Sequence, residues 1–417
     1  MTESQADVVI VGASHGGSEA ATKLRLGGFA GSITVIGAEG FLPYHRPPLS
    51  KAFLAGEVTP DDLLIRAPAA YQNSKIDFHL STIVESIDRE NHALVLANGK
   101  RFGYGKLILA TGGRPRRLTI PGSDLEGLYY MRSIEDVNLL RNAFLPGAKL
   151  VIVGGGYIGL EVAAVAVKQG LTVEIVEFAP RVLARVAGPQ LSAFYETAHS
   201  KAGVQLRLST GVEGFDQAPG NPGHIGAVRC SDGSHLQADL VLIAVGLLPN
   251  TELAAAAGLE IGNGIVVDAS CRTSDPDILA IGDCTEYPLP FLGRRVRLES
   301  VPNALEQGRV AASVINGKPT AYNTVPWFWS DQYNLKLQSV GLSQHHDQVV
   351  LRPPRAPEGF VAFYLQEGRV IAADCVNAVG EFAVAKKLVG DKIIVDPGKM
   401  GDPAVDLKTL LSAAQNA

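Results

Sequence analysis

Gly12-Ala-Ser-His-Gly-Gly17 is the stretch that decides the fold, and a second version of it follows 142 residues later as Gly154-Gly-Gly-Tyr-Ile-Gly159. Each stretch follows an apolar run typical of a strand, Val8 to Val11 and Leu150 to Val153, and each opens an alanine-rich run typical of a helix. A strand, a tight glycine turn and a helix N-terminus together hold the pyrophosphate of a dinucleotide. One such stretch is weak evidence, whereas two in this context predict two dinucleotides in one protein and electron transfer between them.

The bulk properties of the chain narrow its class. With 417 residues it is long enough for about three domains. A net charge of -5 gives no general support for nucleic-acid binding. The polar, acidic N-terminus lacks the features of a signal peptide, and no uncharged apolar run reaches membrane-spanning length. We therefore expect a cytoplasmic protein without nucleic-acid or membrane partners.

The cysteines are too far apart to form a recognisable metal or redox motif. They stand at Cys230, Cys271, Cys284 and Cys375, and the closest two are 13 residues apart. This spacing contains no C-x-x-C pair and no metal-binding pattern. We expect reduced thiols and no metal site.

An internal repeat extends beyond the two glycine-rich stretches. An Asn98-Gly99 turn lies between strand-like runs and is followed by Lys106-Leu-Ile-Leu-Ala-Thr-Gly112. In the second half, an Asp232-Gly233 turn is followed by Asp239-Leu-Val-Leu-Ile-Ala-Val-Gly246. The turn glycine and the closing glycine are 13 residues apart in both halves. Asn-Gly and Asp-Gly favour hairpins with type I′ turns, so each half is predicted to contain a Rossmann-like βαβ unit and a β-meander.

The sequence also predicts how the domains are divided. The segment Thr273-Ser-Asp-Pro-Asp-Ile-Leu-Ala-Ile-Gly-Asp283 resembles the second flavin signature of two-dinucleotide flavoproteins, and its apolar strand would present Asp283 to the cofactor. We therefore predict a discontinuous first domain, residues 1–114 and 247–325, with a second nucleotide-binding domain at 115–246 inserted. From Trp327 the pattern changes to a third, α+β domain at 326–417. Its strand-like runs are Leu337–Val340, Val349–Leu351 and Val361–Leu365, followed by a helical run at Glu381–Val389.

The second glycine-rich stretch predicts an NADH site. Gly154, Gly156 and Gly159 fit the dinucleotide pattern, and the strand Thr172 to Val176 leads to Glu177. A carboxylate there accepts hydrogen bonds from the ribose hydroxyls of NADH, whereas the 2′-phosphate of NADPH about 4 Å away would be repelled by up to roughly 4–8 kcal/mol before screening. Arg181 and Arg185 favour the opposite preference, because arginines bind a 2′-phosphate.

The first glycine-rich stretch departs from the pattern, because Ser14 replaces the middle glycine. The strand Ile33 to Ile36 ends in Gly37-Ala38, so adenosine contacts come either from backbone groups or from Glu39. Further along, Tyr44-His-Arg-Pro-Pro-Leu-Ser-Lys51 contains paired prolines that stiffen the backbone. This segment is suited to presenting Lys51, and the competing interpretation is a surface lysine that begins the next helix.

Longer motifs carry a family resemblance. Together with Tyr157-Ile-Gly-Leu-Glu161, Leu298-Glu-Ser-Val-Pro-Asn-Ala-Leu-Glu306 and Pro326-Trp-Phe-Trp-Ser-Asp-Gln332, the stretches above closely resemble the NADH-dependent ferredoxin reductases of bacterial oxygenase systems. The resemblance covers nearly the whole chain. It implies an α/β, glutathione-reductase-like flavoprotein with two Rossmann-like domains, a C-terminal α+β domain, bound FAD, NADH as donor and a [2Fe–2S] ferredoxin as acceptor. It also implies a monomer, and it favours a haem-thiolate monooxygenase as the final recipient of the electrons.

The same resemblance assigns site residues. FAD contacts, with neighbouring motif positions, are expected at Gly12, Ser14, Gly16, Gly17, Ala38, Arg46, Lys51, Val84, Thr111, Gly112, Arg132, Gly282, Asp283 and Val301. NADH contacts are expected at Gly154, Gly156, Ile158, Gly159, Glu177 and Gly246. In the family, residues matching Lys51 and Glu161 approach each other beside the flavin. Glu161 falls in the first turn of the expected helix, where a carboxylate also interacts favourably with the helix dipole.

A basic docking face is expected because ferredoxins of oxygenase systems are typically acidic. The candidates are Arg294, Arg295, Arg297 and Arg309, together with Lys386 and Lys387 in the third domain. For each of them, an ordinary solvated surface position is the competing interpretation. Trp329 is expected either at the exit side of the flavin or in the core of the third domain.

Other functions on the same fold remain as alternatives. A peroxide or disulfide reductase is disfavoured because no cysteine stands where such enzymes need one. A rubredoxin reductase, a monodehydroascorbate reductase or the reductase of a ring-hydroxylating dioxygenase is separated poorly by sequence. A non-enzymatic alternative is a redox-sensing flavoprotein resembling apoptosis-inducing factor.

Overall fold

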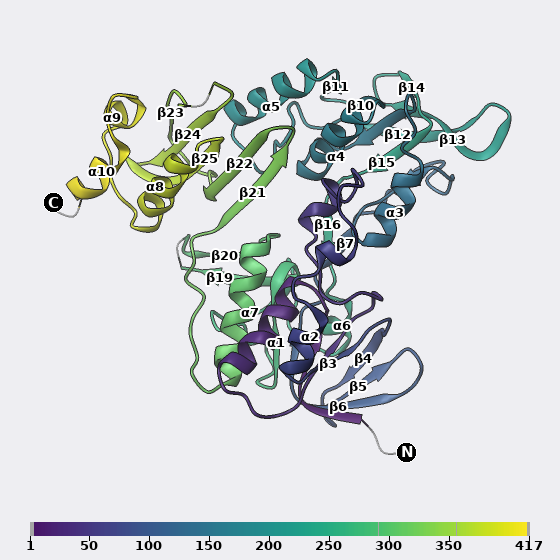
Figure 1. Ribbon diagram of the computed structural model, residues 1–417, viewed down its shortest axis with the longest axis vertical. Helices are drawn as coiled ribbons and strands as arrows, with labels where there is room; N and C mark the ends of the chain where they lie inside the picture. Colours follow the sequence, from purple (N-terminus) through teal and green to yellow (C-terminus); the bar gives the residue numbers. More distant parts are fainter. Residues whose placement is uncertain (1–3, 291, 356, 415–417) are drawn as a thin grey trace. The chain divides into compact units, whose positions relative to one another are not determined.

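The computed structural model describes residues 4–290, 292–355 and 357–414 (Figure 1). The chain divides into two compact units, each assembled from separate segments. The first unit contains residues 1–45, 60–114 and 247–324, and the second contains 46–59, 115–246 and 325–417. The second unit therefore includes Arg46–Thr59, a segment that lies inside the predicted FAD-binding domain.

A parallel sheet forms the centre of the first unit, with the strand order β3-β2-β1-β6-β18. These strands are β1 (Ser4–Val11), β2 (Ile33–Ile36), β3 (Ile76–His79), β6 (Arg101–Leu109) and β18 (Ile278–Ala280). The carboxyl ends are in register, since Val11 pairs with Ile36 and Leu109, and Leu109 pairs with Ala280. All these strands therefore end at one edge of the sheet, which is where ligands bind in α/β folds.

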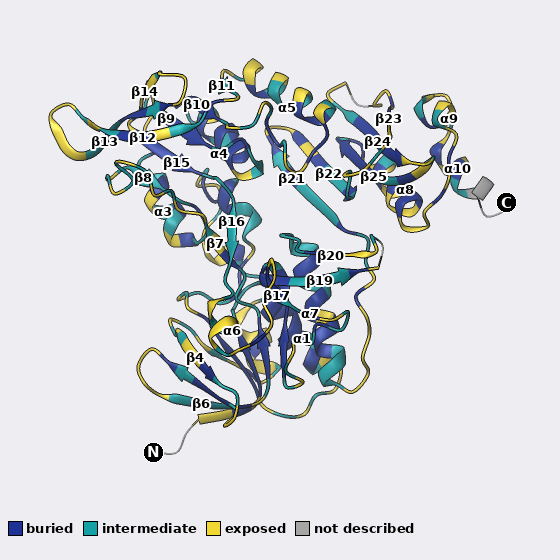
Figure 2. Cartoon of the chain, turned by 180° about the vertical axis from the view of Figure 1, so that it is seen from behind, coloured by how far each residue is buried: buried dark blue, intermediate teal, exposed yellow. Residues whose placement is uncertain are grey.

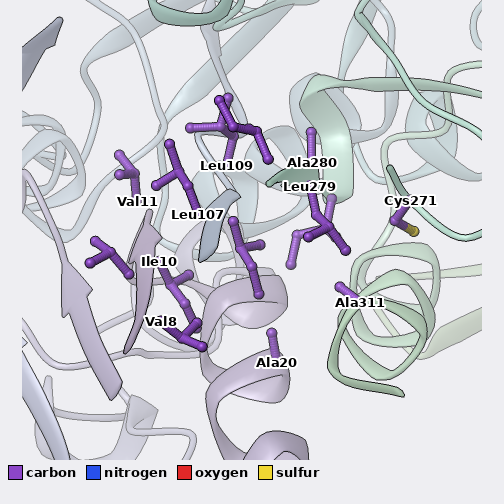
Figure 3. Close-up of a cluster of buried hydrophobic side chains, with 14 of the residues drawn as sticks. Val8, Ile10, Val11, Ala20, Leu107, Leu109, Cys271, Leu279, Ala280 and Ala311 are labelled. Atoms are coloured by element: carbon purple, nitrogen blue, oxygen red, sulfur yellow. The ribbon is translucent and has the colours of Figure 1, made fainter. Parts of the chain in front are cut away.

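Two helices cover this sheet, α1 (His15–Leu26) and α7 (Val301–Ile315). Figure 3 shows how apolar side chains from three strands and both helices meet in one buried cluster. Labelled members include Val8, Ile10, Val11, Ala20, Leu107, Leu109, Leu279, Ala280 and Ala311. Such near-complete burial on both faces explains why these strands are continuous apolar runs in the sequence.

The remaining elements of the first unit flank this core. They are η2 (Asp61–Leu63), α2 (Pro68–Asn73), β4 (Val84–Asp88), β5 (Ala93–Leu96), α6 (Glu252–Ala256), β17 (Ile265–Val266), η3 (Gly282–Cys284), β19 (Thr285–Leu289) and β20 (Arg294–Val296). The chain passes between the two units near β7 (Gly113–Pro115) and β16 (Leu247–Pro249), which pair with each other.

The second unit contains a parallel sheet of the same design, with the order β11-β10-β9-β15-β8. Its strands are β8 (Leu128–Tyr129), β9 (Lys149–Val153), β10 (Thr172–Val176), β11 (Gln205–Arg207) and β15 (Leu240–Ile243). The helices of this part are η1 (Pro47–Ser50), α3 (Ile134–Asn142), α4 (Tyr157–Lys168) and α5 (Pro189–Lys201). Both predicted Rossmann-like sheets are thus confirmed, and β2 and β10 have the predicted bounds.

The two predicted hairpins are present, but their turn type differs from the prediction. The Asn98-Gly99 turn joins β5 to β6, and the Asp232-Gly233 turn joins β13 (Asn221–Cys230) to β14 (His235–Gln237), next to β12 (Val212–Ala218). Only the glycine of each pair has positive φ, at 76° and 83°, whereas type I′ requires it at both central residues. The Asn98 and Asp232 side chains instead accept hydrogen bonds from the backbone two residues later.

An antiparallel sheet follows in the second unit, with the order β21-β22-β25-β24-β23. Its strands are β21 (Trp327–Gln332), β22 (Leu335–Gly341), β23 (Gln348–Leu351), β24 (Phe360–Gln366) and β25 (Arg369–Val376). The helices α8 (Val379–Gly390), α9 (Pro397–Gly401) and α10 (Leu407–Ala414) complete the element order. The predicted α+β pattern is confirmed for β22, β23, β24 and α8, whereas β21 and the central β25 were not predicted as strands.

Burial follows the strands of the two parallel sheets and of the antiparallel β21-β22-β25-β24-β23 sheet (Figure 2). The tip between β12 and β13, by contrast, is exposed. Within the described part of the chain, no helix is both long and apolar enough to cross a membrane.

Candidate functional site

The first glycine-rich loop leads directly from β1 into α1. Gly12 has a φ of 121°, and a Cβ there would lie 2.1 Å from the carbonyl oxygen of Ala110. A Cβ on Gly17 would lie 2.0 Å from the carbonyl oxygen of Gly12. Both positions therefore require glycine, and Ser14 stands at the N-cap of α1. This geometry aims the backbone N–H groups of the first helical turn at the space where a pyrophosphate binds.

The second loop repeats this construction closely. Gly154 has a φ of 109°, and its Cβ would lie 2.5 Å from the carbonyl oxygen of Ala244. A Cβ on Gly159 would lie 2.2 Å from the carbonyl oxygen of Gly154. At Gly156, the N-cap of α4, a Cβ would meet nothing within 4 Å. Open space at this position is what close approach of a phosphate requires, so the loop fits a dinucleotide.

The backbone hydrogen bonds of the two loops are equivalent. Gly12 donates to Ile36, and Gly154 donates to Val176, both at 2.8 Å. The residues after β6 and β15 make matching hydrogen bonds to the strand before each loop. The N–H of Ala110 donates to the carbonyl of Val11 at 2.7 Å, and the N–H of Ala244 donates to the carbonyl of Val153 at 2.8 Å. The internal repeat predicted from the sequence is therefore present at the level of single hydrogen bonds.

Several predicted FAD contacts follow the carboxyl ends of strands in the first unit. Ala38 follows β2 and is exposed, and Thr111 and Gly112 follow β6. The Thr111 hydroxyl donates to the carbonyl of Asn250 at 2.7 Å, and the Asn250 amide donates back to the Thr111 carbonyl at 2.9 Å. Because these strands end in register, the residues after them share one edge of the sheet.

The second flavin signature lies at the same edge. Gly282 and Asp283 begin η3, one residue after β18, and the Gly282 N–H donates to the buried Gln307 side chain at 2.6 Å. Gln307 belongs to α7, whose first residue is Val301. Val84 begins β4, two residues after Thr82, whose N–H donates to the carbonyl of Gly37 at 2.8 Å. These positions fit the first unit as the FAD-binding part.

Other predicted FAD contacts belong to the second unit. Arg46 and Lys51 flank η1, and Arg46 donates through Nη1 to the carbonyl of Arg132 at 2.6 Å. Arg132 precedes α3, whose N-terminus carries a capping box of Ser133 and Asp136. The sequence motif between Tyr44 and Lys51 is thus anchored on the second nucleotide-binding segment.

Glu177 stands directly after β10, at the position expected for a ribose ligand. In this structure its carboxylate accepts hydrogen bonds from the N–H groups of Gly155, at 2.6 Å, and Ala179, at 2.7 Å. The Arg181 guanidinium group, a candidate ligand for a 2′-phosphate, does not bond to this carboxylate. It donates instead to Ser192 and to the carbonyls of Ala187 and Ala184. Ile158 is exposed in the first turn of α4, and Gly246 closes the repeat with a φ of 104°.

Lys51 and Glu161 form an ion pair within the second unit. Nζ of Lys51 lies 2.8 Å from Oε2 of Glu161, and the two side chains are 19% and 5% exposed. Lys51 also donates to the carbonyl of Pro47 at 3.1 Å. Lys51 is therefore not a solvated surface lysine, and the position of its ammonium group is fixed.

The Glu161 carboxylate receives two further hydrogen bonds that the sequence did not predict. The Ser50 hydroxyl donates to Oε2 at 2.5 Å, and the Ser330 hydroxyl donates to Oε1 at 2.6 Å. Both serines lie inside motifs quoted for the family resemblance, since Ser50 precedes Lys51 and Ser330 follows Trp329. The expected place of Glu161 in the first helical turn is wrong, because α4 begins at Tyr157 and has no acidic residue in its first turn. A role at the helix dipole is therefore minor, and the carboxylate is held by its three donors.

The predicted docking residues are less available than expected. The Arg297 side chain is only 10% exposed and pairs with Glu299 at 2.7 Å, which disagrees with its place on an exposed basic face. Arg309 pairs with Glu19 at 2.8 Å and with Glu306 at 2.9 Å. Acidic neighbours thus neutralise much of this charge.

The other candidates are closer to the surface. Arg295 is exposed but donates to the carbonyls of Val267 and Glu286, and Arg294 beside it is exposed. In the second unit, Trp329 is half-buried against Trp327, with ring centroids 5.5 Å apart. The Lys386 ammonium lies 5.2 Å from the centre of the Trp327 ring, a cation–π distance.

All four cysteines are free, buried thiols. Burial raises the pKa of Cys230, Cys271, Cys284 and Cys375, so each favours the unreactive thiol form.

Comparisons with known proteins agree with this geometry. The family model described as pyridine nucleotide-disulphide oxidoreductase matches residues 6–308, and the model described as reductase C-terminal matches residues 327–411. The chain is 44% identical to putidaredoxin reductase of Pseudomonas putida, over 98% of this chain and 97% of that protein. It is 45% identical to a ferredoxin–NAD(P)+ reductase of a Sphingomonas species, over 99% of each. Among solved structures, that of the covalent putidaredoxin reductase–putidaredoxin complex matches with a TM-score of 0.95 and 43% identity, covering 99% of both chains.

The two glycine-rich loops, the aligned strand ends and the open space at Gly156 fit one dinucleotide in each unit. The chain therefore belongs to the pyridine nucleotide-disulphide oxidoreductase family and is an oxidoreductase that uses FAD and NADH.

Proposed function

We propose that this protein is an NADH:ferredoxin oxidoreductase whose electron acceptor is a separate [2Fe–2S] protein. The observation that carries the proposal is the combination of two dinucleotide loops with four cysteines that are buried free thiols. An enzyme of this fold that reduces disulfides needs an accessible, reactive cysteine, and burial disfavours the thiolate at all four positions. The electrons must then leave the protein for an external carrier.

The names of similar proteins support the same class of acceptor. Two of them are called putidaredoxin reductase and ferredoxin–NAD(P)+ reductase, and a putidaredoxin reductase was solved in a covalent complex with putidaredoxin. The ferredoxin proposed here passes its electrons to a haem-thiolate monooxygenase, and this step is supported by the motifs that resemble the reductases of oxygenase systems. A ring-hydroxylating dioxygenase, or a rubredoxin in place of the ferredoxin, is the alternative acceptor system. We place the enzyme in the cytoplasm, where its free thiols remain reduced.

The proposed donor is NADH. Glu177 follows β10 at the ribose position, and its carboxylate repels a 2′-phosphate. Arg181, the nearest candidate for a phosphate ligand in the sequence, is occupied by Ser192 and two carbonyl groups. These contacts remove Arg181 as a phosphate ligand, whereas Arg185 is exposed and its Nη1 lies 4.0 Å from a Cβ built on Gly246.

Bound FAD supplies the exchange between a two-electron donor and a one-electron acceptor. The loop at Gly12, Asp283 and the N-terminus of α7 hold this cofactor, and the loop at Gly156 with Glu177 holds NADH. We assign Lys51 to stabilising negative charge on the reduced cofactor and Glu161 to fixing the position of Lys51. One turnover oxidises one NADH, reduces two ferredoxins and releases one proton.

Steady-state reduction of a [2Fe–2S] ferredoxin, first with NADH and then with NADPH, tests this function. We expect fast turnover with NADH, and slower turnover with NADPH. Rapid flavin reduction without ferredoxin turnover would exclude ferredoxin as the acceptor. Slow flavin reduction with a long-lived charge-transfer band would instead favour the redox-sensing alternative.

A further inference from the structure

A continuous line of buried polar side chains leads away from the Glu161 carboxylate. Ser330 donates to Glu161 at 2.6 Å, and the Gln332 amide nitrogen donates to the Ser330 oxygen at 3.2 Å. The other end of the Gln332 amide faces Nε2 of His199 at 2.8 Å, and Nδ1 of His199 faces the Tyr333 hydroxyl at 2.9 Å. Ser330, Gln332 and His199 are at most 1% exposed, whereas Tyr333 is 40% exposed. The line therefore runs from the surface to the carboxylate, and all its members belong to the second unit.

The chemistry of the two ends fixes the direction of every hydrogen bond. An ionised carboxylate can only accept, so the Ser330 hydroxyl must donate to Glu161. The Ser330 oxygen then accepts from the Gln332 amide nitrogen, which turns the Gln332 carbonyl toward His199. That carbonyl can only accept, so His199 carries its proton on Nε2 and accepts from Tyr333 on Nδ1. Each donor in the line thus points toward Glu161.

The ionisation states of the outer members agree with this direction. Burial lowers the pKa of His199 to about 4, so its ring is neutral near pH 7 and carries a single N–H. Burial also raises the pKa of Tyr333 to about 12, so its hydroxyl keeps the proton that it donates. Aligned donors polarise one another, which strengthens the last bond to the carboxylate.

This line orients groups and does not conduct protons. The Gln332 amide holds its protons firmly and would have to form an unstable tautomer to pass one on. By contrast, the contacts at its inner end are short and charged. Glu161 bonds Lys51 at 2.8 Å on one oxygen, and it bonds Ser330 at 2.6 Å on the other. Because both oxygens belong to one planar carboxylate, the bond from Ser330 to one oxygen also fixes the position of the other. The Lys51 ammonium group bonded to that second oxygen is then fixed as well.

We propose that Ser330, Gln332 and His199 are positioning residues, which act through the Glu161 carboxylate to hold Lys51 where it tunes the flavin. This inference deepens the proposed function and rests on the role assigned there to Lys51. It also explains why the strand β21 ends in Ser330-Asp-Gln332 after an aromatic run, because alternate residues of a strand face the same side.

The test compares flavin midpoint potentials of the FAD-loaded protein by spectroelectrochemical titration, without ferredoxin. We expect Gln332→Leu and His199→Leu to shift the potential to more negative values, in the direction of Lys51→Met and by a smaller amount. His199→Gln keeps a donor at the place of Nε2 and should restore the wild-type potential. The matched control is Gln190→Leu on the same helix as His199, because no hydrogen bond joins the Gln190 oxygen to the described residues.

A double-variant comparison separates positioning from a general structural effect. In a Glu161→Gln background, Gln332→Leu should cause no further shift. An unchanged potential in folded Gln332→Leu, or an equal shift in both backgrounds, would overturn the proposal. If Lys51→Met alone leaves the potential unchanged, the proposed role of Lys51 fails instead.

The direction of the line has an independent test in the wild-type protein. Nitrogen-15 NMR of His199 should show a protonated Nε2 and an unprotonated, hydrogen-bonded Nδ1 at neutral pH. Glu161→Gln should move both resonances, because it removes the charge at the end of the line. The opposite tautomer would contradict the inferred direction, whatever acceptor the enzyme uses.

Discussion

Glu161 is a buried carboxylate whose charge depends on its partners. A buried charge is costly unless it is paired and hydrogen-bonded, and Glu161 has one cation and two hydroxyl donors. Lys51 and Glu161 were predicted through the family resemblance. Ser50 and Ser330 were not, because they lie 111 and 169 residues from Glu161 and no periodicity in the sequence connects them. Contacts of this kind depend on the tertiary fold, so the sequence predicts the charged pair but not the two serines that support it.

Replacing Lys51 tests the charged pair directly. Lys51→Met should slow flavin reduction by NADH about tenfold or more, which corresponds to about 1.4 kcal/mol of transition-state stabilisation. It should also lower the flavin potential, because a positive charge near the reduced cofactor is lost. Stopped-flow absorbance and redox titration measure these effects. Lys51→Arg keeps the charge and should retain more of the rate, and wild-type values for Lys51→Met in both measurements would refute the assignment.

Replacing Glu177 tests the choice of donor. Glu177→Gln removes the negative charge that we propose faces the ribose, but it keeps an oxygen that can accept a hydrogen bond from the loop backbone. We expect the ratio of kcat/KM for NADH to that for NADPH to fall by about tenfold, or about 1.4 kcal/mol. Glu213→Gln, at an exposed position of the same unit, is the control and should leave the ratio unchanged. An unchanged ratio in Glu177→Gln would mean that another group sets the preference for NADH over NADPH.

At the scale of elements, the sequence predicted most where a repeating pattern was present. The apolar runs before each glycine-rich loop became β1 and β9, and β2 and β10 have the predicted bounds. The central strand β25 was missed because its run Arg369–Val376 contains Asp374, which is buried. Its carboxyl group accepts from the Ser339 and Tyr364 hydroxyls, and burial raises the pKa of Asp374. A single buried polar residue interrupts the apolar run by which a buried strand is recognised in a sequence.

Two glycines of the second loop should respond differently to the same substitution. Gly154→Ala places a Cβ 2.5 Å from a carbonyl oxygen at a φ of 109°, so we expect a loss of stability and of NADH turnover. Gly156→Ala meets nothing in the protein, so the melting temperature should stay near that of the wild type while KM for NADH rises about tenfold.

The control for both loop variants is Gly380→Ala in α8, where a Cβ also meets nothing within 4 Å. It should change neither the melting temperature nor KM. Thermal unfolding and steady-state kinetics give the two readouts. A wild-type KM for NADH in Gly156→Ala would show that this position does not face the dinucleotide.

At the scale of the whole molecule, charge governs the encounter with an acidic ferredoxin. The rate of ferredoxin reduction should fall about tenfold between low and 0.5 M salt, because the Debye length shortens from tens of ångströms to a few. Reduction of a small neutral quinone should change little over the same range. A salt-independent rate with ferredoxin would exclude a basic docking face.

The docking face itself can be localised by charge reversal. Arg294→Glu should weaken the salt dependence and raise KM for ferredoxin, whereas Lys318→Glu, at an exposed lysine after α7, is the control. Arg297 is not a useful target, because its side chain is largely buried beside Glu299. Equal effects of both variants would indicate a response to net charge and not to a defined face.

We propose that two dinucleotides in one chain deliver electrons one at a time to an external [2Fe–2S] protein. The most direct test is an anaerobic stopped-flow experiment, in which the FAD-loaded protein and limiting NADH are mixed with excess oxidised ferredoxin. We predict two ferredoxins reduced for every NADH consumed, at a rate no slower than steady-state turnover. Consumption of NADH with reduced flavin accumulating and ferredoxin remaining oxidised would contradict this path of electron transfer.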